Sequence, residues 1–149
     1  MTRPLVFIAH SLGGLVMQQA LVTAREHRTD YLRQIETHTK GICFLGTPHR
    51  DVSFASWGEK AARVMNIFKP VNHQMVSLLE PDSKALLELR RSFHNVLEKR
   101  KEEGARISVV CFYETVPSFR SCIVSEQSAT IDGEPSFPIF ANHGVCSQY

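Results

Sequence analysis

The chain has 149 residues, of which 43% are hydrophobic and 21% are charged. This composition is typical of a globular protein that buries a core of its own, and the length suits a single domain. The formal net charge is only +2 with histidine neutral. The basic residues are not clustered, which excludes the usual electrostatic footprint of a nucleic-acid-binding protein. We therefore expect no nucleic acid partner.

The cysteines and the apolar segments indicate the cellular environment. The four cysteines form no C-x-x-C pair, so we expect no zinc or redox motif, no bound metal, and a reducing intracellular compartment. No signal peptide is recognised. The most apolar stretch, residues 4–22, contains too many polar residues to span a bilayer, so no transmembrane segment is expected.

Apolar strand-like runs alternate along the chain with segments of helical periodicity. Strands are predicted over residues 5–9, 41–45, 107–112, 121–125 and 138–140. Helices are predicted over residues 15–25, 30–36, 54–68, 73–79 and 81–101. Gly104 stands where a C′ glycine is expected after the last of these helices. This order predicts an α/β fold whose doubly wound, mainly parallel sheet starts at the first strand and carries helices on both faces.

The strongest functional signal joins the first strand to the first helix, where residues 9–14 read A-H-S-L-G-G. A strand that turns directly into a helix around a serine is typical of the nucleophile elbow of α/β-hydrolases. The sharp turn places Ser11 in a strained backbone conformation and lifts its hydroxyl above the carboxyl edge of the sheet. The helix N-terminus favours negative charge there, and the N–H of Leu12 is the expected oxyanion donor.

The residues around Ser11 support this interpretation. Strand and helix nearly touch at an elbow, so the positions two before and two after the serine have to be small. Ala9 replaces the usual first glycine, and Gly13, followed by Gly14, meets the second requirement. The side chain of His10 points away from that of its neighbour, so we expect a structural role at the elbow. A phosphate-binding turn is the alternative, but the G-x-G-x-x-G and G-K-[ST] patterns are absent.

A serine nucleophile needs a base, and the base needs an acid that orients it; in α/β-hydrolases the chain order is Ser, acid, His. Glu114 follows the strand predicted over 107–112 and is our candidate acid. Its alternative role is that of a surface glutamate, and Asp132, in a loop before the last strand, is the rival acid. His143 follows the last strand and is the candidate base. His49 precedes both acids, so we expect it to line the pocket or to hold its loop.

An amphipathic pattern over residues 54–68 follows a strand that ends near Ser11. Residues 51–70 are therefore a candidate lid whose apolar face meets acyl chains, with Trp57 as a pocket residue. An ordinary packing helix explains the same pattern equally well.

Several motifs together resemble a known family. Residues 8–16, the G-T-P-H-R segment at 46–50 and the A-N-H segment at 141–143 are similar to the lipase-like serine-active-site-containing protein family of the α/β-hydrolase superfamily, in particular its fungal-type members. The F-Y-E-T segment at 112–115 and residues 128–129 are similar to that family as well. The elbow motif is common to many lipases, whereas its combination with the other segments is more specific. The resemblance covers essentially the whole chain.

The resemblance implies a serine hydrolase of carboxylic esters, or a lipid-remodelling enzyme, that works through an acyl-enzyme intermediate. Ser11 would be the nucleophile, Glu114 the acid and His143 the base, and no cofactor is needed. The implied partner is an ester or lipid substrate, with peripheral membrane contact. The implied location is the mitochondrion, the endoplasmic reticulum or a membrane.

The family's fold places several strands before the elbow strand, and the chain has no room for them after Met1. We therefore expect residues 1–149 to form a single, N-terminally truncated domain that lacks the loop with the second oxyanion donor. Loss of one such donor costs roughly 10²–10³ in rate. The expected loss of this loop leads to a second hypothesis, in which the chain is not an enzyme. It would then be a truncated or degenerate, non-catalytic hydrolase-like module that serves an interaction or no function. The sequence leaves the oligomeric state open.

Overall fold

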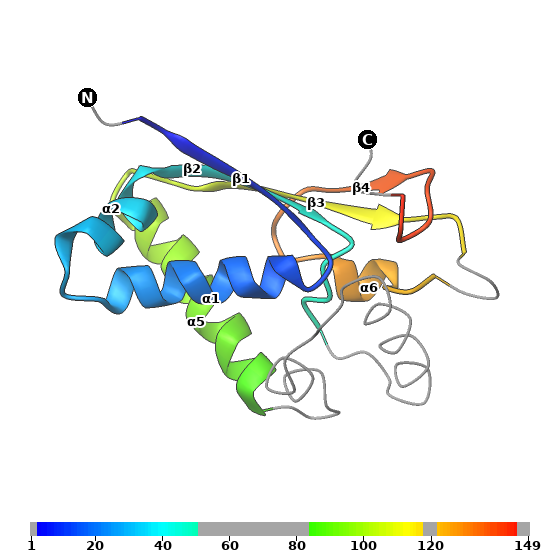
Figure 1. Cartoon of the computed structure of the whole chain (residues 1–149), viewed down its shortest axis with the longest axis horizontal. Helices are drawn as coiled ribbons and strands as arrows, with labels where there is room; N and C mark the ends of the chain where they lie inside the picture. The colour runs from blue at the N-terminus through cyan, green and yellow to red at the C-terminus, as the bar shows by residue number, and fades with distance from the viewer. Residues whose placement is uncertain (1–2, 51–83, 118–121, 146–149) are drawn as a thin grey trace.

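A computed structural model describes residues 3–50, 84–117 and 122–145 of the chain. Its elements are, in chain order, β1 (Leu5–His10), α1 (Gly13–Glu26), α2 (Asp30–His38), β2 (Thr39–Leu45), α5 (Lys84–Glu102), β3 (Ser108–Glu114), α6 (Glu126–Ala129) and β4 (Ser136–Ile139) (Figure 1). The helices predicted over 54–68 and 73–79, the candidate lid and Trp57 lie outside the described residues.

The four strands form one parallel sheet in the order β1-β2-β3-β4. In the register, Ala9 lies beside Phe44, Phe44 beside Cys111, and Cys111 beside Ser136. The predicted α/β fold with a parallel sheet is therefore confirmed. Because all four strands run in the same direction, the turns that follow them meet at one edge of the sheet, which brings the candidate site residues together.

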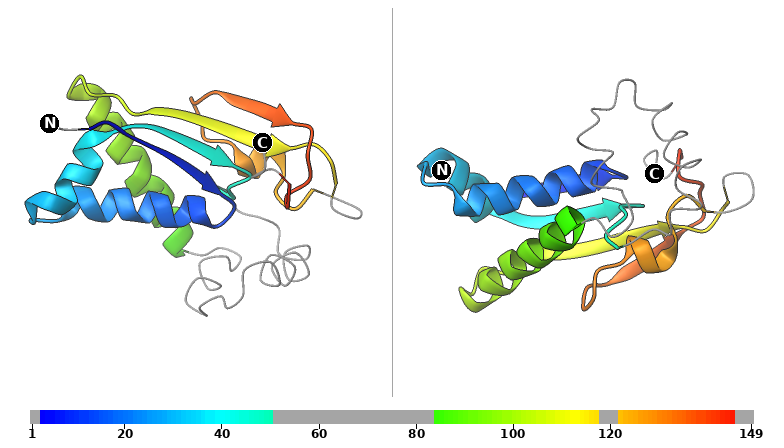
Figure 2. Two further views of the ribbon diagram at one scale, coloured as in Figure 1. Left: turned by 45° about the horizontal axis from the view of Figure 1, so that its top comes forward. Right: turned by 90° about the horizontal axis from the view of Figure 1, so that it is seen from below.

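The described helices cover one face of the sheet, whereas the sequence led us to expect helices on both. In Figure 1, α1, α5 and α6 all lie below the sheet, and the view from below in Figure 2 shows them in front of it. The strand order explains this arrangement. Every crossover steps to the next strand in the same direction, so right-handed connections place each helix on the same face. Two covered faces require a reversal of the strand order.

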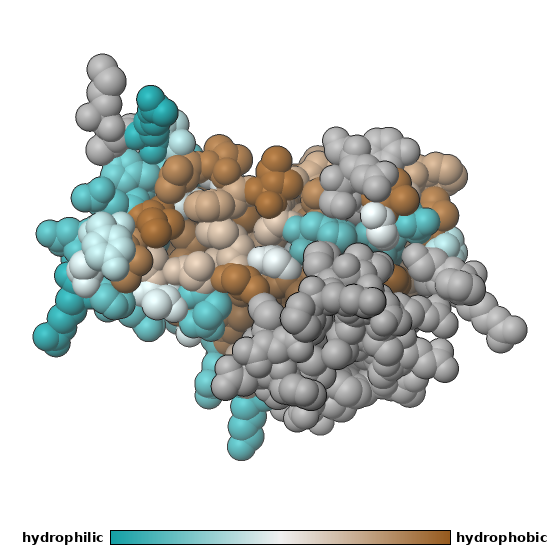
Figure 3. All heavy atoms as spheres, in the orientation of Figure 1, coloured by the Kyte–Doolittle hydropathy of each residue, from teal (hydrophilic) through white to brown (hydrophobic). Residues whose placement is uncertain are grey.

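The two faces of the sheet differ accordingly in burial. On the covered face, Phe44 and Cys111 are fully buried and pack in one core with Phe93 of α5. On the opposite face, Val6 and Ile8 of β1 leave 67% and 74% of their surface exposed. Figure 3 shows hydrophobic residues gathered along the upper part of the molecule, where the sheet lies.

Two local predictions have different outcomes. The edge strand predicted over 121–125 is wrong for its described residues, 122–125, which lead instead into α6. The hydroxyl of Ser125 caps that helix by accepting a hydrogen bond from the N–H of Ser128 (3.3 Å). This cap favours the start of a helix at Ser125 over a continued strand. The C′ role of Gly104 is confirmed: its φ is 68°, and the N–H of Ala105 bonds to the carbonyl of Arg100 at 2.9 Å.

Candidate active site

Ser11 occupies the turn between β1 and α1 with a φ of 54°, a conformation that a residue with a side chain rarely adopts. Its N–H donates to the carbonyl of Leu45 at 2.9 Å, and its own carbonyl accepts from the N–H of Gly14 at 3.0 Å. The chain thus extends the β1 ladder by one residue and begins the helix at once. Strain of this kind costs on the order of 1–3 kcal/mol and persists only where the surroundings hold it.

The tightest approach at the elbow is at Gly14 rather than at Gly13. Among the described residues, a Cβ on Gly13 would meet nothing within 4 Å, whereas a Cβ on Gly14 would lie 2.1 Å from Oγ1 of Thr47. We predicted the close approach at Gly13, and within this part of the chain it is found at Gly14. The first turn of α1 packs against the segment after β2, which carries the fully buried Thr47. Ala9, two residues before the serine, is buried beside Phe44 as expected.

This difference gives a matched pair of variants. We expect Gly14→Ala to lower the free energy of unfolding by about 1–3 kcal/mol or more, because the added methyl group has to displace Thr47. Gly13→Ala places its methyl group at a position in α1 that no other described residue approaches within 4 Å. We expect that variant to be neutral or to gain up to about 1 kcal/mol, since alanine is the better helix former. Urea unfolding of both variants tests this, and equal losses would contradict it.

His143 lies in the turn after β4, and its Nε2 is 2.8 Å from the Oγ of Ser11. The two side chains come from positions 132 residues apart in the chain, and each residue is only 1% exposed. A hydroxyl and an imidazole nitrogen at this distance form the nucleophile–base contact on which serine hydrolases depend.

Glu114 is the last residue of β3 and lies on the other side of the His143 ring. Its Oε1 accepts a hydrogen bond from the main-chain N–H of Val124 at 2.6 Å, which anchors the carboxylate to the segment before α6. Its Oε2 is 3.8 Å from Nδ1 of His143, which is longer than a hydrogen bond but close enough to stabilise the imidazole when it takes up a proton. Contacts of this kind in an unliganded site shorten when substrate is bound.

The rival acid, Asp132, is placed differently. Its side chain is 69% exposed and forms ion pairs with Arg50 and with Arg90, the latter at 3.0 Å. The structure therefore brings Glu114 to His143, while Asp132 is held by two arginines elsewhere.

The electrostatics of the site suit a base. Burial, followed by the nearby ring of His10, lowers the pKa of His143 to about 4. The imidazole is therefore neutral near pH 7, so one of its nitrogens accepts a hydrogen bond and the other, which carries the proton, donates one. Because Glu114 lies on the Nδ1 side, it favours the tautomer with the proton on Nδ1. That tautomer leaves the Nε2 lone pair directed at Ser11.

Gly46 is a site residue that the motif analysis did not single out. It follows β2 with a φ of 53°, and a Cβ there would lie 3.2 Å from Nδ1 of His143. Both its backbone conformation and its closeness to the imidazole favour glycine. The signal was present in the sequence as the G-T-P segment that ends a strand.

Leu12 is the N-cap residue of α1, and its carbonyl accepts from the N–H groups of Leu15 (3.0 Å) and Val16 (3.2 Å). Main-chain N–H groups at this end of a helix have no partner within the helix. The N–H of Leu12 is thus in the position expected of an oxyanion donor next to the nucleophile.

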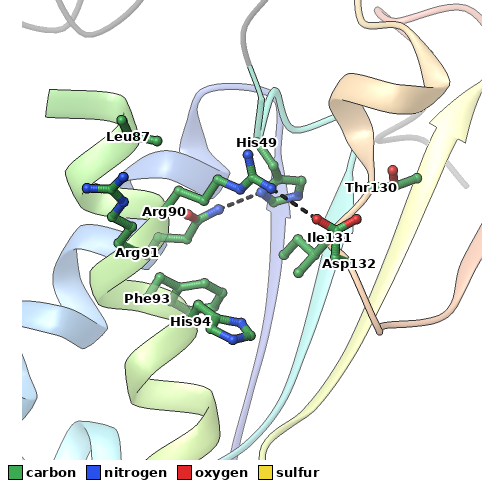
Figure 4. A pocket seen from close by; sticks show the side chains of 10 residues that line it. His49, Leu87, Arg90, Arg91, Phe93, His94, Thr130, Ile131 and Asp132 are labelled. Atoms are coloured by element: carbon green, nitrogen blue, oxygen red, sulfur yellow. Dashed lines mark hydrogen bonds and ion pairs between the residues drawn. The ribbon is translucent and has the colours of Figure 1, made fainter. Parts of the chain in front are cut away.

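His49 is buried and accordingly neutral. Nε2 of Gln18 lies 2.6 Å from its Nδ1, and burial, with Arg50 and Arg90 as lesser causes, lowers the pKa of His49 to about 3. The residue lines a cavity of about 410 Å³ between α5 and the segment after α6 (Figure 4). The described lining of this cavity includes Asp132 and Arg90 but none of the three candidate catalytic residues. His49 therefore lines a cavity, but not one that includes Ser11 among its described lining residues, so its expected role in the pocket at Ser11 stays a prediction.

The described part of the chain contains no group of three or more His, Cys, Asp or Glu side chains arranged to hold a metal ion. None of its helices combines the length and the apolar character needed to cross a membrane.

Comparison with known proteins finds similarity to Protein SERAC1 of several vertebrates. The chain is 31% identical to Protein SERAC1 of Danio rerio over 117 residues, which cover 78% of this chain and 16% of the relative. It is 30% identical to the protein of Mus musculus and 29% identical to that of Homo sapiens, in each case over 150 aligned residues that cover 97% of this chain and 21% of the relative.

The chain spans about a fifth of the length of the curated relatives it matches. No family model matches it, and neither does any solved structure. These relatives do not test whether the fungal-type members are nearer, so that part of the resemblance stays a prediction. At about 30% identity, the chain is homologous to a segment of Protein SERAC1.

Proposed function

We propose that this chain is a serine hydrolase that acts on carboxylic esters, with Ser11 as nucleophile, His143 as base and Glu114 as orienting acid. The observation that carries the proposal is the 2.8 Å contact between Oγ of Ser11 and Nε2 of His143 at a strained elbow. A structural hydrogen bond needs neither a positive φ at the serine nor a carboxylate on the far side of the imidazole. All three features together are those that nucleophilic catalysis requires.

The proposed reaction starts when Nε2 of His143 takes the proton of Ser11 as Oγ attacks the ester carbonyl. The Leu12 N–H stabilises the oxyanion of the tetrahedral intermediate, and Glu114 stabilises the imidazolium. The intermediate collapses, the alcohol leaves with the proton from Nε2, and an acyl-enzyme remains. Water then gives a proton to His143 and attacks the acyl carbon. Collapse of this second intermediate returns the proton to Oγ of Ser11 and releases the acid.

The finer assignment, a lipase-like serine-active-site-containing protein that acts on an ester or lipid substrate, belongs to the same proposal. It is supported by the motifs around Ser11, Thr47 and His143, by the α/β fold and by homology to a segment of Protein SERAC1. Peripheral membrane contact and the membrane, mitochondrial or endoplasmic reticulum location are likewise proposals that follow from this resemblance.

A fluorophosphonate probe tests the proposal directly, because it reacts only with a serine whose hydroxyl is activated. The full chain is treated with the probe, digested, and analysed by mass spectrometry. We expect the adduct on the peptide that contains Ser11 and on no peptide from heat-unfolded protein. A folded chain that takes no label, or takes it on another serine, would contradict the proposal and leave the non-catalytic module as the better account.

The pH dependence of ester hydrolysis is a further prediction. We expect kcat/KM to stay level as the pH falls below 6.5, the ordinary pKa of histidine, and to decline as it approaches about 4, where His143 takes up a proton and can no longer act as base. The direction follows from burial, which disfavours the imidazolium. A pH–rate profile with circular dichroism at each pH, to verify folding, tests this. An acid limb at or above pH 6.5 would contradict it.

A further inference from the structure

The turn that carries His143 is joined directly to the end of the strand that leads into Ser11. β1 and β4 lie at opposite ends of the strand order and do not pair with each other. Nevertheless, Nε2 of His10, at the end of β1, lies 2.9 Å from the main-chain carbonyl of His143 after β4. The contact spans 133 positions of the chain. It links the segments of the proposed nucleophile and the proposed base without passing through the strands between them.

The chemistry of this contact fixes the role of His10. A carbonyl oxygen only accepts hydrogen bonds, so Nε2 of His10 has to carry a proton and donate it. The two imidazoles lie with their centroids 4.9 Å apart and their planes tilted by 38°. Because His10 holds the main chain of His143, both ring nitrogens of His143 stay available, Nε2 toward Ser11 and Nδ1 toward Glu114.

We infer that His10 is a positioning residue of this site: its Nε2–H holds the His143 carbonyl and thereby sets the distance from the base to the Ser11 hydroxyl. The inference rests on the proposed serine-hydrolase function. A Cβ on Gly46 would lie 3.2 Å from Nδ1 of His143, so the space around the ring is already tight there. The base is therefore held by a hydrogen bond to its main chain, and Gly46 leaves little free space beside its ring. A displacement of about 1 Å in such a site costs on the order of 10²-fold in rate.

Two variants that differ by one methylene group test the inference. The amide nitrogen of His10→Gln reaches as far as Nε2 of the imidazole and keeps a donor for the carbonyl, whereas that of His10→Asn stops short of it. Kinetics on a soluble ester are measured with the full chain. We expect kcat of His10→Asn to fall by roughly 10–10², with KM within about twofold of the original, and His10→Gln to recover most of the loss.

His38→Leu is the matched control. Nδ1 of His38 also lies against a main-chain carbonyl, that of Gln34 at 2.7 Å, but on exposed helix α2. We expect its kcat to be unchanged. Equal kcat in His10→Asn and the original chain, or a loss in His10→Gln as large as in His10→Asn, would overturn the inference, because a donor at Nε2 would then be irrelevant.

A second readout needs no turnover and separates this inference from the proposed function. Proton–nitrogen NMR spectra of the histidine rings report the hydrogen bonding of Nε2 in His143, with the signal assigned through His143→Gln. We expect this signal to move in His10→Asn and to return in His10→Gln. If the original chain neither hydrolyses esters nor reacts with the fluorophosphonate probe while the NMR signal still moves as described, the catalytic proposal fails. In that case the positioning of His143 by His10 is supported. If the signal is the same in all three proteins, the inference fails.

Discussion

Replacement of Ser11 by alanine is expected to lower kcat of ester hydrolysis by on the order of 10⁴-fold or more. The variant keeps the imidazole, the carboxylate and the Leu12 N–H but has no oxygen to attack the carbonyl. Alanine and serine bear the same strain at a φ of 54°, so the elbow should fold as before. Stopped or continuous assays with a chromogenic ester measure the loss.

The control for this variant is Ser92→Ala, which removes a half-buried hydroxyl from the middle of α5. We expect it to hydrolyse the ester at the original rate. Thermal unfolding of both variants shows whether any loss of activity is caused by a less stable fold. Retention by Ser11→Ala of more than about a tenth of the original kcat would be incompatible with nucleophilic catalysis by this serine.

The second large effect is expected at Glu114. Changing it to glutamine keeps the shape of the side chain and lets Oε1 still accept from the N–H of Val124, so the segment before α6 stays anchored. The variant loses the negative charge that stabilises the imidazolium. Its amide can also donate to Nδ1 of His143, which favours the wrong tautomer. We expect kcat to fall by roughly 10²–10⁴, since loss of the acid in a related triad costs about 10⁴.

Asp132→Asn is the matched comparison, because it makes the same chemical change at the rival acid. Asp132 is exposed and paired with Arg50 and Arg90, so we expect kcat to change by less than about twofold. Steady-state kinetics of the two variants decide between the carboxylates. A larger loss at Asp132 than at Glu114 would refute the assignment of Glu114 as the acid.

The strained turn, the candidate acid and the candidate base could be predicted from the sequence because each closely follows a predicted strand. An apolar strand followed at once by S-L-G-G predicts a strained turn with Ser11 at its centre, and Ser11 has that turn. Glu114 and His143 were found in the same way, by looking for an acid and a histidine after successive strands. Strand ends meet at one edge of a parallel sheet, so the order of the elements already predicted that these residues would be neighbours.

Features that depend on contacts between distant segments could not be found this way. Gly13 and Gly14 are adjacent and equally small, and only the packing of Thr47 shows that Gly14 is the one without room for a side chain. His10 was assigned a general structural role because neighbouring side chains point apart. Its actual contact lies 133 positions away, beyond the reach of any local pattern.

The sequence by itself determined the class of fold, the position of the strained serine and the identities of the candidate acid and base, because strand-to-helix turns are encoded by a few adjacent residues. The tertiary structure alone decided that the described helices share one face of the sheet, that Asp132 pairs with arginines instead of a histidine, that Gly46 lies close to the His143 ring, and that His10 contacts the His143 carbonyl. The physical reason is the same in each case. Strand order and side-chain packing arise from contacts among residues far apart in the chain, and periodicity and spacing report only on residues that are close in it.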